Sequence, residues 1–352
     1  MRVPAIKSLT PYFPAVRFSV VKNFLLIAQA ILTAKSTNLS VAKDRIGALR
    51  QVNDRQPCSH YKRLIRFFNY NQPVDLTFCI LQCTFALLSG RVRYLILDAT
   101  TWQVGQKNVQ LLVLSLLYQD VAIPIFWQDL NKKGHSSEKE RQAFIEKAAQ
   151  LFNLKGKVLL ADREYTGQRW FTYLHGQGID FVIRLPRECY KYDTLTSYRS
   201  LARKALRRKR AVWTWVNWPD CRLKLVMCRN RETGHDSRKK DEPVFYWLTS
   251  LDNVHTAAEL YRKRWRIEQC FKAFKSNGFN LEAMNFKKPS KIELLMAVVV
   301  FVYVLSIYEG VNQKKQITTK RYADQSTAPA QSLFKKGLDV LNAMLIIFQQ
   351  FL

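Results

Sequence analysis

Three acidic residues stand where their carboxylates could share one metal ion. Asp98 and Asp162 each follow a short apolar run, so each is expected to end a buried strand. Glu268 is the single acid within YRKRWRIEQCFKAFK, the segment Tyr261–Lys275, among six lysines and arginines. Like charges that converge need a cation between them. Oxygen-only ligands select a hard ion such as Mg²⁺ or Mn²⁺.

A site of this kind suits chemistry at phosphorus. Two ions about 3.5–4 Å apart activate a water or a 3′-hydroxyl and steady the leaving oxygen during in-line attack. The alternative for each aspartate alone is an ordinary acid at a strand end. The alternative for Glu268 is a solvated helix with ion pairs at i,i+4. The pair of aspartates in this order favours the metal site.

The basic segment predicts a helix with one functional edge. Counting about 100° per residue from Tyr261 places Arg264 near 300°, Lys275 near 320° and Glu268 near 340°. We expect Arg264 and Lys275 to clamp phosphates, and Tyr261 to hydrogen-bond a phosphate or position a ligand. The neighbouring stripe is expected to face the core and consists of Leu260, Ile267, Phe271 and Phe274.

The elements that must position these acids begin after Arg91. The sequence predicts three strands, a helix opened by a capping box at Ser137 and Glu140, a fourth strand, a second helix and a fifth strand. The strands are expected at Tyr94–Trp102, Val109–Gln119, Val121–Leu130, Lys157–Tyr165 and Asp180–Leu185. This order is that of a ribonuclease-H-like α/β fold, a mixed five-stranded sheet flanked by helices. In that layout the first and fourth strands are neighbours, so Asp98 and Asp162 converge.

The rest of the chain divides into segments that differ in residue pattern and in predicted secondary structure. Residues 1–88 are expected to form an α-helical N-terminal DNA-binding domain, with Ser40 capping one helix. Residues 89–310 form the catalytic domain, interrupted at 187–252 by a β-rich insertion. In that insertion Trp213 and Trp215 share a strand face and are expected in the core. Residues 311–352 form a helical C-terminal region whose first part, 311–333, is expected to be irregular. A second capping box is predicted at Thr256 and Glu259.

Composition points to a polyanionic partner. The 352-residue chain has 56 Lys and Arg against 27 Asp and Glu, a formal charge of +29 that is spread along the sequence. Nucleic acid is the commonest polyanion, and a membrane surface is the rival. The apolar run Leu294–Tyr308 is fifteen residues long, short of the ~18–20 that span a bilayer, and predicts a buried core segment. Seven cysteines without a C-x-x-C pair favour reduced thiols in a cytoplasmic protein over a zinc site.

Several blocks of the chain resemble one family. The spacing Tyr261-x2-Arg264-x3-Glu268-x6-Lys275 is similar to the YREK signature of bacterial insertion-sequence DDE transposases of the IS-four-like family. LILDATTWQVG and VLLADREYTG resemble that family's two aspartate blocks, and PIFWQDLNKKGHSSEKER resembles the stretch between them. The resemblance runs from about Tyr94 to Lys275.

The resemblance implies a complete reaction. Asp98, Asp162 and Glu268 would be catalytic residues and the ligands of Mg²⁺ or Mn²⁺, as two ions. A homodimer on double-stranded DNA would bind the terminal inverted repeats of the element, cleave its ends and join the 3′-hydroxyls to target DNA, in the bacterial nucleoid. Relatives of this kind release the element through a DNA hairpin and hold a flipped base with a tryptophan of the insertion, a role open here to Trp213, Trp215 or Trp218.

Four further residues have expected roles near the three acids. Arg163 is expected to contact a phosphate of the DNA or an acid, and Glu164 to lie just beyond the strand end. His135, in the loop before the capped helix, could approach DNA. Glu259 is assigned to the helix cap rather than to the metal.

Other classes fit the sequence less well. A simple ribonuclease-H-like nuclease has no need of the edge formed by Tyr261, Arg264 and Lys275. A catalytically inactive, transposase-derived DNA-binding protein or repressor would be expected to have lost one of the acids, and all three are present. The five histidines give no arrangement of the kind a tyrosine recombinase needs. The dispersed basic residues differ from the terminal amphipathic helix of a membrane-surface protein.

Overall fold

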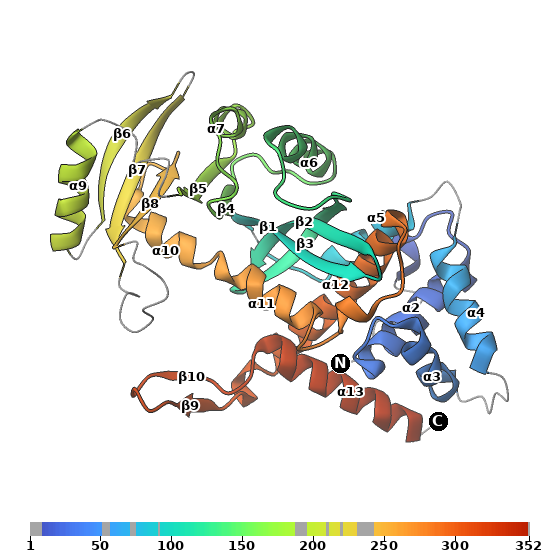
Figure 1. Cartoon of the computed structure of the whole chain (residues 1–352). Coiled ribbons are helices and arrows are strands. Elements are labelled where there is room, and N and C mark those ends of the chain that lie inside the picture. Colours follow the sequence, from blue (N-terminus) through green and yellow to red (C-terminus); the bar gives the residue numbers. More distant parts are fainter. Residues whose placement is uncertain are drawn as a thin grey trace. The chain divides into compact units, whose positions relative to one another are not determined.

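The structure is a computed structural model that describes residues 9–50, 57–70, 75–90, 92–186, 196–208, 211–218, 221–230 and 243–350. The chain forms two compact units, whose elements are labelled in Figure 1. The first unit comprises Met1–Gly90, Thr101–Val109 and Cys270–Leu352, and the second comprises Arg91–Thr100 and Gln110–Gln269. All three predicted acids therefore belong to the second unit.

One mixed sheet has eight strands, in the order β3-β2-β1-β4-β5-β8-β7-β6. β1 pairs in parallel with β4, and β4 with β5. The pairs β2–β3, β5–β8, β7–β8 and β6–β7 are antiparallel. The strands are β1 (Tyr94–Val104), β2 (Lys107–Tyr118), β3 (Val121–Asp129), β4 (Val158–Ala161), β5 (Asp180–Arg184), β6 (Val212–Trp218), β7 (Cys221–Arg229) and β8 (Val244–Thr249).

The five predicted strands are present as β1 to β5, and β1 and β4 are neighbours as expected. The sheet is larger than the predicted five strands because the β-rich insertion joins it. β8 pairs with β5 through Thr249 and Val182, and β7 and β6 follow. The result is a mixed α/β architecture with a large mixed sheet flanked by helices.

Helices cover both faces of this sheet. α6 (Glu138–Leu151) and α7 (Gln168–Gly176) lie on the same side in Figure 1. Phe144 of α6 contacts Phe126 of β3 with ring centroids 4.9 Å apart, and Phe171 of α7 stacks on Phe181 of β5 at 5.5 Å. α10 (Ala257–Arg262) packs against β4, β5 and β8, and α9 (Thr196–Arg207) packs against β6 to β8. Burial of large aromatic and aliphatic side chains at these contacts is the main source of stability.

The predicted continuous helix of the basic segment is interrupted. α10 ends at Arg262, and α11 spans Trp265–Phe274. Between them the amides of Lys263 and Arg264 bond to carbonyls three residues back, those of Leu260 and Tyr261, at 3.0 and 2.9 Å. Such i→i−3 bonds tighten the backbone. Arg264 therefore lies in a turn between two helices and not within one continuous helix.

The helix caps follow the sequence only in part. The capping box of Ser137 and Glu140 is confirmed, with both reciprocal bonds present. The box predicted at Thr256 is wrong, because its side chain accepts no capping bond and instead donates to the carbonyl of Asn253 at 3.0 Å. The Asn253 side chain accepts from the amide of His255 and begins the turn there. Ser40 is also not a cap, since the Asn38 side chain accepts from its amide at 2.9 Å.

The first unit is mainly helical: α2, α4, α5 and α13 pack against one apolar helix, α12, and α3 packs against α2 and α4. Phe301 of α12 contacts Phe24 of α2 with ring centroids 4.8 Å apart, and Tyr303 contacts both Phe274 and Phe334 at 5.2 Å. The helices are α2 (Phe18–Ala34), α3 (Leu39–Arg50), α4 (Pro57–Phe68), α5 (Leu76–Phe85), α12 (Pro289–Asn312) and α13 (Leu333–Gln350).

α12 is longer than its apolar run suggested. It has 24 residues, so by length and composition it meets the requirement for a membrane-spanning helix, contrary to the prediction from the run of fifteen. However, 83% of its apolar window is buried inside the structure. This burial, rather than the length of the run, supports a core helix.

The segment after α12 is regular, not irregular as predicted. β9 (Thr319–Arg321) and β10 (Thr327–Pro329) form an antiparallel hairpin. The predicted C-terminal helix follows as α13.

Two glycines allow α12 and α13 to approach closely. A Cβ at Gly337 would lie 1.8 Å from the carbonyl oxygen of Ser306, and a Cβ at Gly310 would lie 1.9 Å from that of Leu333. We expect Gly337→Ala to lower the free energy of unfolding by about 1–3 kcal/mol, because the backbones must separate.

Urea denaturation measures this change. The control is Gly176→Ala in α7, where an added Cβ meets nothing within 4 Å, and which we expect to be neutral or slightly stabilising. Equal stabilities of the two variants would contradict the close approach of α12 and α13.

Candidate active site

Asp98 and Asp162 lie side by side at the end of a parallel ladder. Leu97 of β1 pairs with Ala161 of β4, so the aspartates are the next residues of both strands. β1 itself continues to Val104, so Asp98 does not end its strand as predicted; what ends there is the pairing with β4. Because side chains alternate along strands, both carboxylates point to the face on which α10 packs.

A third polar residue completes this row. Ile183 of β5 pairs with Ala161, which places Arg184 in line with Asp162 on the same face. Arg184 contributes to holding the pKa of Asp162 down and its guanidinium also lies 4.5 Å from the ring centroid of Phe245. The sequence reasoning missed Arg184. The sequence did contain a signal for it, because Arg184 stands near the end of the fifth predicted strand, just as Asp162 stands near the end of the fourth.

Arg264 joins the three acids. Its Nη1 donates to Oδ2 of Asp98 at 3.1 Å, and its Nη2 donates to Oε1 of Glu268 at 2.7 Å. The same Nη2 lies 4.0 Å from Oδ2 of Asp162. The side chain of Arg264 is only 12% exposed. The acids predicted from separate parts of the sequence therefore converge on one guanidinium group.

Further donors fix the orientation of the two aspartates. The hydroxyl of Tyr261 donates to Oδ1 of Asp162 at 2.8 Å, and the amide of Arg163 donates to the same oxygen at 2.8 Å. The amide of Ala99 donates to Oδ1 of Asp98 at 2.9 Å. One oxygen of each aspartate is thus held by the protein, while the other points toward Arg264.

The two aspartates differ electrostatically. Burial raises the pKa of Asp98 to about 7, against the attraction of Arg264 and with the repulsion of Glu164 and Asp162. Burial also disfavours the charge of Asp162, but Arg264, the Arg163 amide and the Tyr261 hydroxyl together bring its pKa below the usual value. Burial and the neighbouring Asp162 raise the pKa of Tyr261, so its hydroxyl keeps the proton that it donates. The acids keep Arg264 charged despite its burial, since they raise its pKa.

The carboxylate oxygens of the three acids suit a hard metal ion, although they are not close enough to one another to surround one. Within the described residues no three acidic, histidine or cysteine side chains are grouped closely enough to hold an ion. The reason is visible at Arg264, whose guanidinium stands among the three carboxylates. The three carboxylates supply the oxygen ligands that Mg²⁺ and Mn²⁺ prefer, and they already surround one cation, the guanidinium of Arg264. An ion and Arg264 would compete for the same oxygens.

Other predicted residues are placed as follows. Lys275 follows α11, donates to the carbonyl of Thr101 at 2.8 Å and pairs with Glu282 at 3.0 Å. The side chain of Arg163 is exposed beside Asp162. Glu164 pairs with Nδ1 of His135 at 2.8 Å, so the loop before α6 is bonded to the turn after β4. On the predicted core stripe, Leu260, Ile267 and Phe274 are buried and Phe271 is half-buried.

The face of the sheet that carries the acids continues into the insertion. Arg184 pairs with Trp247 of β8, Trp247 with Val226 of β7, and Val226 with Trp213 of β6. The ring of Trp247 lies 5.8 Å from that of Tyr261. The register therefore places Asp162, Trp247 and Trp213 on one face, and Trp215 shares it because side chains alternate along β6.

Trp213 and Trp215 are not core residues, so the prediction for them was wrong. They are 38% and 39% exposed and contact each other edge to face at 5.7 Å. The guanidinium of Arg222 lies 4.1 Å from the Trp215 ring. Exposed aromatic rings beside cations suit a nucleic acid better than a protein core. The side chain of Trp218 lies outside the described residues.

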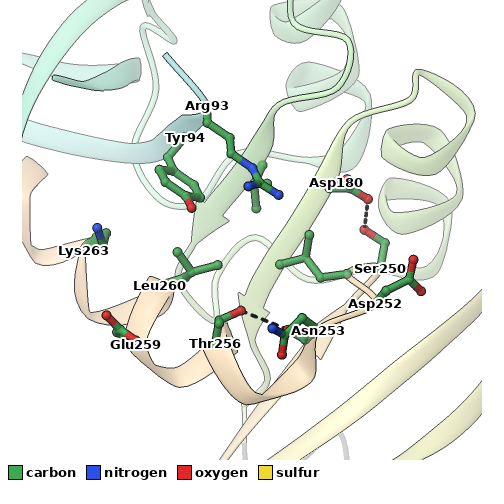
Figure 2. Close-up of a pocket in the computed structure, with 12 residues that line it drawn as sticks. Arg93, Tyr94, Asp180, Ser250, Asp252, Asn253, Thr256, Glu259, Leu260 and Lys263 are labelled. Atoms are coloured by element: carbon green, nitrogen blue, oxygen red, sulfur yellow. Dashed lines mark hydrogen bonds between the residues drawn. The ribbon is translucent and has the colours of Figure 1, made fainter. Parts of the chain in front are cut away.

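A separate cavity lies at the other end of the strands. It has a volume of about 490 Å³, and Figure 2 shows Tyr94, Asp180 and Lys263 around it. Tyr94 and Asp180 begin β1 and β5, whereas the acids follow the ends of the parallel ladders. Glu259 also lines this cavity, so it belongs neither to a helix cap nor to the row of acids.

Comparison with known proteins decides the family. A family model described as "Transposase DDE domain" matches residues 92–305, more than half of the chain. The chain belongs to the DDE transposase family. The matched range contains Asp98, Asp162 and Glu268, and DDE transposases are metal-dependent nucleases and transferases. No curated protein sequence matches this transposase.

Solved structures give a fold comparison for the transposase. It is similar to the structure titled "Cryo-EM structure of piggyBac transposase synaptic complex with hairpin DNA (SNHP)", with a TM-score of 0.51 and 10% sequence identity. The similarity covers 97% of this chain and 73% of that chain. At this identity the comparison supports the mixed α/β fold of the transposase.

Proposed function

We propose that this chain is a transposase of the IS-four-like family, with a ribonuclease-H-like catalytic fold, that cleaves the ends of an insertion sequence and joins them to target DNA. The observation that carries the proposal is the convergence of Asp98, Asp162 and Glu268 on Arg264, with Tyr261 bonded to Asp162. The DNA complex named for the similar piggyBac structure and the charge of +29 support a DNA partner. The terminal inverted repeats and a homodimer on them are part of the proposal.

The residues would divide the work as follows. Asp98, Asp162 and Glu268 would hold the divalent ions, which supply an activated nucleophile and neutralise charge on the leaving oxygen. Arg264 would move from the carboxylates to a DNA phosphate, for which its fork of donors is suited. Tyr261 holds Asp162 in place, and Arg163 and Lys275 would contact the DNA backbone. Residues 1–88 would bind the terminal repeat.

A joining assay tests this function. The purified chain would be incubated with a labelled terminal repeat from the DNA that flanks its gene, a supercoiled target plasmid and Mg²⁺ or Mn²⁺. We expect labelled repeat covalently joined to plasmid. Cleavage at the repeat boundary without joining would indicate a nuclease. Binding without cleavage in either metal would indicate an inactive DNA-binding protein and overturn the proposal.

The exposed tryptophans give a further expected result. If Trp213 and Trp215 stack on an unpaired base, their joint replacement by alanine should weaken binding of a repeat carrying an unpaired boundary base about tenfold or more, since base stacking contributes ~1–3 kcal/mol per base. Binding of the fully paired repeat should change less.

Trp265 provides the control for this measurement. It is 49% exposed on α11, and we expect Trp265→Ala to leave the preference for the unpaired base unchanged. An equal loss in Trp265→Ala, or none in the double variant, would argue against stacking. Fluorescence anisotropy with both DNA forms measures the difference.

A further inference from the structure

The hairpin between α12 and α13 is an exposed, ordered and basic arm. We define the arm as residues 314–329, which contain η4 (Lys314–Gln316), β9 and β10. Within it every residue except Ile317 and Ala328 is exposed, and Tyr322 at the turn is 53% exposed. Such a projecting polar hairpin adds little to a hydrophobic core, so packing does not account for it.

Local bonds keep the arm in one shape. Thr327, Ala328 and Pro329 pair with Arg321, Lys320 and Thr319. The turn is closed by the amide of Tyr322, which donates to the carbonyl of Ser326 at 2.9 Å. Oδ1 of Asp324 accepts from the amide and the hydroxyl of Ser326 at 2.9 and 2.6 Å. These bonds lower the pKa of Asp324 and engage the only acid of the arm in the turn itself.

The charge of the arm identifies the kind of partner. It carries four cations, Lys314, Lys315, Lys320 and Arg321, against Asp324. Lys320 and Arg321 are successive strand residues and so leave opposite faces of the ribbon. A polyanion would attract the arm from either face.

We propose that the β9–β10 arm binds the phosphate backbone of duplex DNA, with Lys320 and Arg321 as the contacting residues. A two-stranded ribbon is of a size that the major groove admits. Lys and Arg contacts to phosphates position a protein without reading sequence. The arm would therefore add affinity for any duplex, including the target DNA. This inference rests on the proposed function for the identity of the polyanion.

The test compares Lys320→Gln/Arg321→Gln with the wild-type chain on a duplex of unrelated sequence at several salt concentrations. We expect affinity to fall about tenfold and the slope of log K against log salt to become shallower by about 2, because each phosphate contact contributes about 0.9. The charge-preserving variant Lys320→Arg/Arg321→Lys should bind as the wild type does. All these positions are exposed, so the variants are expected to fold.

A matched control separates the arm from overall charge. Lys139 and Lys147 are exposed on α6, and Lys139→Gln/Lys147→Gln removes the same charge. An equal loss in this control would overturn the proposal. A photo-crosslinking residue in place of Tyr322 gives a second measurement: crosslinks to DNA are expected, and crosslinks only between protein chains would overturn it.

The outcome is distinguishable from failure of the proposed function. If the wild-type chain cleaves and joins terminal repeats while the arm variant binds duplex equally well, only the arm proposal fails. If the arm variant loses duplex affinity while the wild type never cleaves, the arm is supported and the catalytic proposal fails.

Discussion

Replacing any one of the three converging acids by its amide should reduce cleavage of the terminal repeat by about a thousandfold or more. Asp98→Asn, Asp162→Asn and Glu268→Gln keep the shape of each side chain and remove its charge. A metal centre supplies several kcal/mol of transition-state stabilisation, and about 4 kcal/mol corresponds to a factor of a thousand. Initial rates on a denaturing gel measure the loss.

Two controls separate a loss of catalysis from a loss of DNA binding and from the removal of any acidic residue. The variants should bind the repeat at least as tightly as the wild type, because each removes negative charge from the proposed DNA-binding site. Glu259→Gln is the matched control: it removes an exposed acid of the same unit that lines the separate cavity, and it should cleave normally. Cleavage by Asp98→Asn within a few-fold of wild type would remove that residue from the catalytic set.

The second large effect is expected at Arg264. Arg264→Met leaves Asp98, Asp162 and Glu268 close together without their shared cation. Removing one partner of a largely buried ion pair costs about 3–5 kcal/mol, and we expect about 3 here because Asp162 and Glu268 are partly exposed. Millimolar Mg²⁺ should restore part of the lost stability, since the ion would bind the oxygens that the guanidinium vacates. Urea denaturation with and without EDTA measures both effects.

Arg266 supplies the comparison for Arg264. It lies two residues away and forms an ion pair with Asp120 that is partly exposed on both sides. Exposed pairs contribute about 0–1 kcal/mol, so Arg266→Met should be nearly neutral and insensitive to Mg²⁺. If Arg264→Met is as stable as the wild type in EDTA, the guanidinium does not hold the acids together.

The core of the site was predictable because it depends on strand order. The alternation of apolar runs and helices predicted that the strands bearing Asp98 and Asp162 are neighbours, and their ladder confirms it. The neighbouring fifth strand also ended in Arg184, whose place in the row follows from the same register. Sheet register therefore carries more information about this site than the identity of any one acid.

The parts that failed depend on contacts distant in sequence. The break before α11 involves Lys263 and Arg264, which are good helix formers, and no glycine or proline marks it. Arg264 at this turn donates to Asp98 of β1, a residue 166 positions away that only the folded sheet brings close. The alternation of residues around Trp213 predicts which side chains share a face of the strand, but it does not predict which of the two faces is covered by another element. That choice is made by α9, which packs on the other face of β6 and β7.

The central claim is that Asp98, Asp162 and Glu268 form one metal centre, and Fe²⁺-directed cleavage of the protein tests it most directly. Fe²⁺ would replace Mg²⁺, and ascorbate with peroxide would generate radicals at the bound ion that cut the nearby polypeptide. The account predicts cuts beside residues 98, 162 and 268 that Mg²⁺ suppresses and that Asp98→Asn and Glu268→Gln abolish. Cuts elsewhere in the chain, or cuts unaffected by these substitutions, would contradict it.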